Sequence, residues 1–159
     1  MEPCLLDVVS IPLADDGPHR DIQPENRRIL EGPWQPRGRA RSEKVIRYCQ
    51  TRGLILHNAD RRIHIDQLRK VADEDRHSLC LIRATVTFDT DATRKGRKRV
   101  WASFAFDGNP YRIPVTDYKF EHDFPPYSTR KADCLLTLSL GLPYEGDNCY
   151  KFVAGVLEL

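Results

Sequence analysis

The amino-acid sequence predicts a mainly β fold, a small antiparallel barrel that carries one or two short helices. Two observations lead to this prediction. The second half of the chain holds five short apolar or alternating segments, and turn residues separate them at short intervals. No helix-length periodic segment lies between them, as the parallel strands of a βαβ fold would require.

Length and composition set the class of protein. The chain has 159 residues, of which 40% are hydrophobic and 30% are charged, as is typical of a globular domain. No apolar run approaches the roughly 20 residues of a membrane-spanning helix, and the N-terminus lacks the basic residues of a secretory signal. The five cysteines are odd in number and form no CxxC pair, which favours a reducing, cytoplasmic compartment. We therefore expect no membrane segment, no metal and no cofactor.

In the first half of the chain the predicted elements are short. Residues 5–11 form a β-branched apolar run that ends at Pro12, and they predict a strand. Residues 14–41 are rich in proline, glycine and charge, so we expect a long irregular connection with one turn of helix near residues 25–30. Further along, the sequence predicts a helix at residues 42–50, small strands at 54–57 and 63–65, and a helix at 66–71.

The second half is more regular. Residues 78–88 begin as an apolar run and then alternate, and residues 99–106 alternate aromatic with small side chains. The charged segment between them predicts a β-hairpin with a long basic tip. A turn follows at residues 107–110. The remaining predicted strands are residues 111–116, interrupted by Pro114 and so at an edge, 134–140 and 150–159.

Charge is unevenly distributed along the chain, although the formal net charge is only +2. Residues 27–52 carry eight basic and two acidic side chains, and residues 78–101 carry six basic and two acidic ones. Residues 1–26 carry six acids and one base. Two basic segments are therefore available to bind a polyanion, or to pair with acids of the same fold.

The basic hairpin tip is the first candidate site. It holds five basic residues within six positions, namely Arg94, Lys95, Arg97, Lys98 and Arg99. We expect these side chains to contact nucleic-acid phosphates, and Trp101 or Tyr111 to offer a stacking face for a base. The alternative is a solvated tip whose charges block edge-to-edge aggregation, with Trp101 in a core.

Arg37, Arg39 and Arg41 form the second basic segment. Guanidinium groups suit bidentate phosphate contacts, so we assign these residues to the same predicted nucleic-acid site. The alternative, which the small net charge favours, is that they pair with the acidic N-terminal segment.

Motifs for catalysis are poor. The sequence has no GxSxG, P-loop, GxGxxG or HExxH motif. His57 and His64 flank Asp60, and the EHD cluster at residues 121–123 is expected in a loop. We therefore predict a protein that is not an enzyme, and we keep a hydrolase that uses His57, Asp60 and His64 as a third class of function.

Three segments carry a resemblance to a known family. The first is LDVVSIPL at residues 6–13, followed by PH at 18–19 and QPEN at 23–26. The second is YRIPVTD at residues 111–117, and the third is LSLGLPYEG at 138–146 with CYKFVA at 149–154. In this order they resemble the bacterial dual OB-containing domain family, and the likeness covers most of the chain.

The resemblance implies two consecutive OB-type barrels, a nucleic-acid or nucleotide ligand, and a place near prokaryotic conflict and antiphage systems. On this basis we divide the chain into residues 1–77, an incomplete N-terminal OB-like half with a long Pro/Arg-rich loop and a short helix, and residues 78–159, a C-terminal OB-like barrel. The chain begins almost on the first motif, so we expect the N-terminal barrel to be minimal or to be completed by strands of a partner.

Together these observations predict a non-enzymatic protein that binds single-stranded DNA or RNA, as an accessory component of a prokaryotic defence or mobile-element system. The alternative is a protein-interaction subunit or inhibitor that docks on a larger defence enzyme through an open barrel edge. The near-neutral net charge favours the alternative, whereas the basic tip favours nucleic acid.

Overall fold

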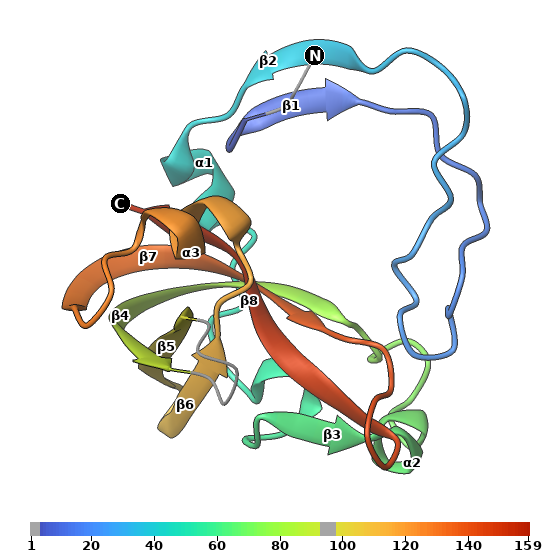
Figure 1. Ribbon diagram of the computed structural model, residues 1–159. Coiled ribbons are helices and arrows are strands. Elements are labelled where there is room, and N and C mark those ends of the chain that lie inside the picture. Colours follow the sequence, from blue (N-terminus) through green and yellow to red (C-terminus); the bar gives the residue numbers. More distant parts are fainter. Residues whose placement is uncertain (1–3, 93–97) are drawn as a thin grey trace.

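Strands form most of the chain in the computed structural model, which describes residues 4–92 and 98–159 (Figure 1). They make a two-stranded sheet and a six-stranded sheet. In chain order the elements are β1 (Asp7–Ser10), β2 (Gln35–Arg39), α1 (Ser42–Ile46), the 3-10 helix η1 (Ile55–His57), β3 (Arg62–His64), α2 (Ile65–Arg69), β4 (Leu79–Ala92), β5 (Lys98–Phe106), β6 (Asn109–Pro114), α3 (Tyr118–Asp123), β7 (Thr129–Leu140) and β8 (Asn148–Glu158). The predicted mainly β fold is confirmed.

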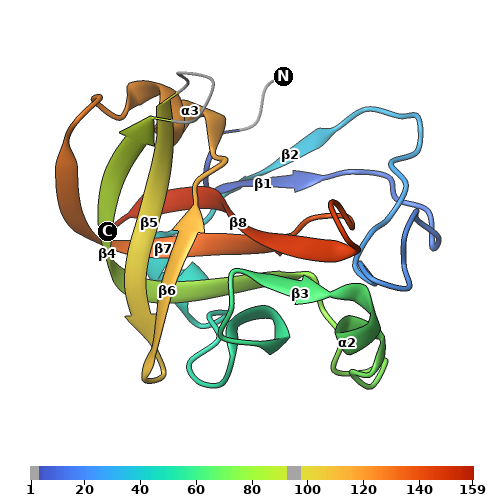
Figure 2. The ribbon, with the colours of Figure 1, turned by 60° about the horizontal axis from the view of Figure 1, so that its bottom comes forward.

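The strands from β4 to β8 form the barrel. The six-stranded sheet has the order β3-β8-β7-β4-β5-β6, and every neighbouring pair is antiparallel. A parallel bridge between Val115, just after β6, and Val153 in β8 brings the two sides of the curled sheet together. Five strands in this order, with α3 between the third and the fourth, have the arrangement of an OB fold. Figure 2 shows β5 and β6 at the front of this barrel.

Thr116 and Asp117 hold the barrel closed. The backbone N–H of Thr116 donates to the carbonyl oxygen of Val153 at 2.8 Å. The Asp117 carboxylate accepts the backbone N–H of Val156 at 3.0 Å and that of Phe120 at 3.1 Å. The bond to Phe120 caps the N-terminus of α3. A single carboxylate therefore joins the crossover helix to the last strand.

Alternation along the strands fills the barrel interior. In β4, the side chains of Ile82, Val86 and Phe88 are fully buried, and those between them face outwards or are less buried. Ile55 and Leu56 of η1 are also fully buried, in the same hydrophobic cluster. Burial of one such side chain contributes roughly 1.5–3 kcal/mol, so η1 is firmly attached to the barrel.

The N-terminal strands form a small sheet of their own. β1 and β2 pair antiparallel, with a register shift between Val8 and Val9. Both views place this hairpin away from β5 and β6 (Figures 1 and 2). The connection between the two strands is irregular, as its proline and glycine content predicts. β2 itself lies within residues 14–41, where the sequence predicts no strand, because its pairing with β1 is a contact that Pro36 and Gly38 do not indicate. The division of the chain into two domains, residues 1–77 and 78–159, stays a prediction.

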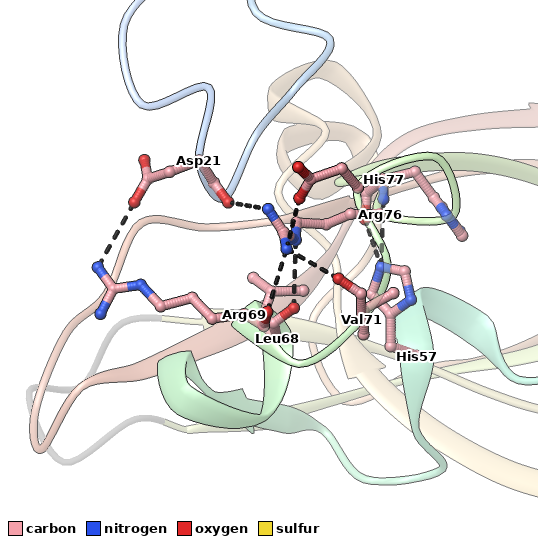
Figure 3. Close-up of polar contacts among 8 residues, drawn as sticks. Asp21, His57, Leu68, Arg69, Val71, Arg76 and His77 are labelled. Carbon is pink, nitrogen blue, oxygen red and sulfur yellow. Dashed lines mark hydrogen bonds and ion pairs between the residues drawn. The ribbon is translucent and has the colours of Figure 1, made fainter.

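Arg76 fixes the segment between α2 and β4 (Figure 3). Its guanidinium donates to three carbonyl oxygens at the end of α2, those of Leu68, Arg69 and Val71. It also donates to the carbonyl oxygen of Asp21, in the long N-terminal connection, at 2.9 Å. These bonds add to the backbone hydrogen bonds at the end of α2, and they attach the N-terminal connection to it.

The QPEN segment at residues 23–26 attaches the N-terminal connection to the barrel. The side-chain amide of Gln23 donates to the carbonyl oxygen of Leu140, at the end of β7, at 2.7 Å. The Glu25 carboxylate accepts the backbone N–H and the hydroxyl of Ser78 at 2.7 and 2.8 Å. It also accepts the N–H of Leu79 at 3.2 Å, where β4 begins. This motif therefore has a structural role.

The LSLGLPYEG segment makes the turn between β7 and β8. A Cβ atom on Gly141 would lie 2.8 Å from Cε2 of Phe152, so a side chain at this position would displace the ring. Gly146 has a φ of +67°, in the left-handed region that favours glycine. Tyr144 and Asn148 exchange backbone hydrogen bonds across the turn. These residues therefore set the geometry of the turn.

Two predicted elements are wrong in type. Residues 54–57 were expected as a strand, but they contain η1, because Leu56 and His57 adopt φ angles of 47° and 79°. Positive φ angles break an extended chain and let it turn back on itself. The structure describes residues 25–30, and it shows no helical turn there, since Glu25 is held at the start of β4.

Two helices also differ from expectation. The EHD cluster at residues 121–123 lies in α3 rather than in a loop. The helix predicted at residues 42–50 ends at Ile46. None of the helices in the described parts of the chain has the length and apolar character that a membrane crossing requires.

The two roles of Asp117 predict a large effect of its removal. In Asp117→Ala the N-terminus of α3 loses its cap and the N–H of Val156 loses its acceptor. We expect the free energy of unfolding, measured by urea denaturation with circular dichroism, to fall by about 2–4 kcal/mol. The exposed Asp123 at the other end of α3 provides the control. Asp123→Ala should change the free energy of unfolding by less than about 0.5 kcal/mol. Equal stability of the two variants would contradict this role.

The hydrogen bonds of Glu25 predict a contribution to the free energy of unfolding that is lost at low pH. Burial favours the neutral carboxyl, but hydrogen bonds from Ser78 and Leu79 outweigh it and lower the pKa of Glu25. Because the folded-state pKa lies below the unfolded one, the contribution is complete above the ordinary glutamate pKa of 4.5 and is lost as the pH falls through the folded-state pKa.

We expect Glu25→Gln to lower the free energy of unfolding by about 1–3 kcal/mol at pH 7. The gap between the variant and the wild type should shrink as the pH falls below 4.5. A gap that stays constant from pH 7 to pH 3 in parallel urea titrations would show that the carboxylate charge has no role.

Candidate nucleic-acid interface

The outer face of β5 carries an aromatic ring that other side chains cover. Val100 and Ala102 are fully buried inside the barrel, so Trp101 between them points outwards. The strand register places Trp101 beside Asp89 of β4 and Pro114 of β6. Trp101 is nonetheless only 7% exposed.

Three guanidinium groups lie around this ring. The Cζ atom of Arg112 is 4.7 Å from the ring centroid, that of Arg61 is 5.5 Å away, and that of Arg99 is 5.9 Å away. Each such cation–π contact contributes about 0.5–1 kcal/mol at an exposed site. We call Trp101 together with Arg61, Arg99 and Arg112 the arginine face.

The arginine face carries an excess of positive charge. Asp89 accepts a hydrogen bond from Arg112 at 2.6 Å and neutralises one of the three charges. Within residues 4–92 and 98–159, neither Arg61 nor Arg99 forms an ion pair. Like charges gathered on one ring repel one another, and a bound anion relieves this repulsion. The electrostatics of the face therefore favour a polyanionic ligand.

The indole nitrogen of Trp101 adds an unused hydrogen-bond donor. Nε1 is buried and has no partner among the residues that the structure describes. A buried donor without an acceptor costs about 1–3 kcal/mol. A phosphate oxygen or a base carbonyl that displaced part of the arginine cover would supply the acceptor.

Lys151 in β8 positions Arg61. Lys151 is fully buried, and its ammonium donates to the carbonyl oxygens of Ile55 and Asn58, both at 2.6 Å. A third bond, of 2.7 Å, runs to the side-chain oxygen of Asn58. The backbone N–H of Lys151 donates to the carbonyl oxygen of Arg61 at 2.9 Å. One residue therefore holds both ends of the segment that carries Arg61.

Tyr111 completes the attachment of η1. Its hydroxyl accepts the backbone N–H of Ile55 at 3.2 Å, and its ring centroid lies 5.6 Å from Nζ of Lys151. Both backbone polar groups of Ile55 are thus satisfied by barrel residues. Burial lowers the pKa of Lys151 to about 8.

The two aromatic residues expected to stack on bases lie in different places. Tyr111 is 5% exposed, and its ring packs on Phe104, with centroids 5.6 Å apart. Tyr111 is therefore a core residue, contrary to the expectation that it offers a stacking face. Trp101 lies on the outer face, but under guanidinium groups, so a base reaches its ring only if an arginine moves.

The structure describes two members of the basic tip, Lys98 and Arg99, and they have different surroundings. The other three members lie outside the described residues, namely Arg94, Lys95 and Arg97. Arg99 is exposed and belongs to the arginine face. Lys98 instead donates to the carbonyl oxygens of Phe124 at 2.6 Å and His122 at 3.3 Å, at the end of α3. Contrary to expectation, Lys98 is thus engaged within the fold, where it stabilises a helix C-terminus.

The second basic segment lies apart from the arginine face. Arg37 and Arg39 are exposed on β2, and Arg41 follows it, in the hairpin that both views place away from β5 and β6 (Figures 1 and 2). Arg39 pairs with Asp7 at 3.5 Å, as the alternative interpretation predicts. Arg37 donates to the side chain of Gln35 at 2.7 Å. These arginines do not join the arginine face.

The histidines named for a hydrolase have separate structural partners. Nε2 of His57 lies 2.8 Å from the carbonyl oxygen of His77, and the two rings are 4.4 Å apart (Figure 3). Burial lowers the pKa of His57. His64 accepts the backbone N–H of Asp66 at 3.2 Å through Nδ1. Within the described parts of the chain, no three His, Cys, Asp or Glu side chains are grouped to hold a metal ion.

Sequence analysis missed two members of the arginine face. Arg112 carries a usable signal, because it alternates with the buried Tyr111 and Ile113 and must face outwards. Arg61 carries no such signal. Its place depends on the contacts that Lys151 makes from far along the chain.

The contacts of Lys151 predict a loss of stability when its ammonium is removed. Lys151→Met removes the ammonium from one buried and two partly buried oxygen acceptors, so we expect the free energy of unfolding to fall by about 2–4 kcal/mol in urea denaturation. Lys131 is exposed on β7, and Lys131→Met is the matched control, with an expected change below about 0.5 kcal/mol. If both variants unfold at the wild-type midpoint, the buried ammonium does not anchor η1.

Comparison with known proteins agrees with this architecture. The family model of the dual OB-containing domain matches residues 1–156, which is nearly the whole chain. No curated protein and no solved structure matches it. OB folds bind oligonucleotides on the face of their second and third strands, which here are β5 and β6, so the family is consistent with nucleic-acid binding at a coarse level. The chain belongs to the dual OB-containing domain family.

Proposed function

We propose that this protein binds single-stranded nucleic acid on the arginine face. The observation that carries the proposal is the gathering of three guanidinium groups on one buried indole, on the outer side of β5 and β6. Only one of these charges is paired with a carboxylate among the described residues. Phosphates would bind the arginines in bidentate contacts, and the planar guanidinium groups would also stack on bases.

The preference for a single strand follows from this stacking. Unpaired bases can turn their faces towards guanidinium planes, whereas the bases of a duplex are stacked on one another. The unused Nε1–H of Trp101 gives the site one further donor once a ligand shifts the arginine cover. The binding is non-enzymatic in this proposal.

The proposed site also includes the other basic residues of the tip, Arg94, Lys95 and Arg97, which precede Arg99 closely in the sequence. Basic side chains of this kind bind nucleic-acid phosphates independently of sequence.

The proposal predicts a large effect when the three arginines of the face are replaced together. For Arg61→Gln, Arg99→Gln and Arg112→Gln combined, we expect about 100-fold weaker binding of a single-stranded oligonucleotide, or about 1 kcal/mol for each arginine. The log–log salt slope should become shallower by about 2. Fluorescence anisotropy with a labelled oligonucleotide at several salt concentrations measures both quantities.

A matched control separates the face from net charge. Arg37→Gln, Arg39→Gln and Arg41→Gln combined remove the same charge from the β1–β2 hairpin, and we expect affinity within about twofold of the wild type at moderate salt. Equal losses in both triple variants would show that binding is not localised on β5 and β6.

We expect the basic tip to make a smaller, separate contribution to the affinity for nucleic acid. We replace only Arg94, Lys95 and Arg97 with Ser, because Lys98 stabilises the end of α3. The expected loss is about tenfold at low salt, since the tip supplies phosphate contacts but no stacking. Unchanged affinity in the same anisotropy assay would remove the tip from the site.

A protein-interaction role is the second candidate. The N-terminal connection and β1 expose several large apolar side chains, namely Leu5, Val8, Leu13, Ile29, Leu30 and Trp34. Exposed apolar residues in one region favour contact with another protein. Size-exclusion chromatography with the products of neighbouring genes tests this role, and a stoichiometric complex without nucleic acid would favour it.

The cellular setting is also part of the proposal. All five cysteines lie among the described residues and are free thiols, which supports a reducing, cytoplasmic compartment. The resemblance stated above supports an accessory role in a prokaryotic defence or mobile-element system.

A further inference from the structure

A polar hollow of about 440 Å³ lies beside the arginine face. Its lining comes from the segment before β3, from β3 itself, from α2 and from the start of β8, namely Asp60, Arg61, Arg62, His64, Gln67 and Asn148. A volume of this size accommodates a nucleotide-sized group. Arg61 borders both the hollow and Trp101, so the two features share one side chain.

Arg62 and His64 share the outer side of β3. They flank the buried Ile63, and their register partners in β8 are Tyr150 and Asn148. Arg62 donates to the hydroxyl of Tyr150 at 3.3 Å, which orients the guanidinium and leaves it further N–H donors. The N–H of Asp66 occupies Nδ1 of His64, so the proton of the neutral ring lies on Nε2, which is the second donor.

The charges of the hollow favour an anion. Arg61 and Arg62 are positive and Asp60 opposes them, so the lining carries one net positive charge. A phosphate monoester carries about −1.5 to −2 charges at pH 7 and offers three acceptor oxygens. These oxygens match the three donor side chains Arg61, Arg62 and His64, whereas a phosphodiester inside a strand offers only two, so a terminal phosphate suits this hollow better.

We infer that the hollow binds a terminal phosphate monoester, held by Arg61, Arg62 and His64. The inference rests on the proposed function, because Arg61 would then receive the end of a strand that crosses the arginine face. The carboxylate of Asp60 and the amide of Gln67 are placed to bind sugar or base groups next to the phosphate. A free mononucleotide offers the same chemistry.

The test compares two labelled single-stranded oligonucleotides that differ only in a 5′-phosphate or a 5′-hydroxyl. We expect the wild-type protein to bind the phosphorylated strand about tenfold more tightly in fluorescence anisotropy. Arg62→Gln should abolish this preference and leave the affinity for the 5′-hydroxyl strand within about twofold. Arg69→Gln, which removes an exposed arginine of α2 outside the hollow, is the control and should keep the preference.

Thymidine 5′-monophosphate distinguishes the two sources of the phosphate. Calorimetric binding of this nucleotide that is lost in Arg62→Gln assigns the hollow to free nucleotides, whereas a preference shown only by oligonucleotides assigns it to strand ends. Equal affinity of the wild type for both strands, without nucleotide binding, overturns the inference and leaves the proposed function intact. A preference that survives in Arg62→Gln also overturns it. If neither strand binds, the proposed function itself is wrong.

Discussion

The buried Lys151 holds the segment that carries Arg61 at the end of the barrel. Removing a charge from water is costly unless hydrogen bonds satisfy it. The three hydrogen bonds of the Lys151 ammonium all run to carbonyl or amide oxygens and none to a carboxylate. The ammonium is satisfied by oxygens of Ile55 and Asn58, which must therefore sit at the end of the barrel. That position carries Leu56 into the core and brings Arg61 to Trp101.

The sequence motifs that resemble the family are mostly structural. Gln23 and Glu25 of the QPEN segment attach the N-terminal connection to the ends of β7 and β4, and Gly141 allows the turn after β7. Arg112 is the exception, because it lies within the YRIPVTD segment and also belongs to the arginine face. These motifs thus chiefly attach loops to the barrel, whereas the proposed ligand contacts come from the arginine face.

The sequence predicts the strands well because alternation is a local property. Trp101 and Arg112 could be placed on the outer side of β5 and β6 from their buried neighbours alone. Helix α3 was missed because it spans only six residues and depends on the cap that Asp117 provides. The 3-10 helix η1 and the place of Arg61 depend on Lys151, whose contacts are long-range and leave no periodic signal. Lys98 was assigned to the ligand because sequence alone does not show that the end of α3 lies beside it.

The anchor at Lys151 also bears on how this protein can diverge in evolution. Two of the three oxygens that its ammonium holds, and the oxygen bonded to its backbone N–H, belong to the main chain, which is the same for every amino acid. Descendants of this scaffold can therefore exchange Ala59, Asp60 and Arg61 while the loop keeps its place. New recognition properties can arise there by point mutation, at little risk to the architecture beneath.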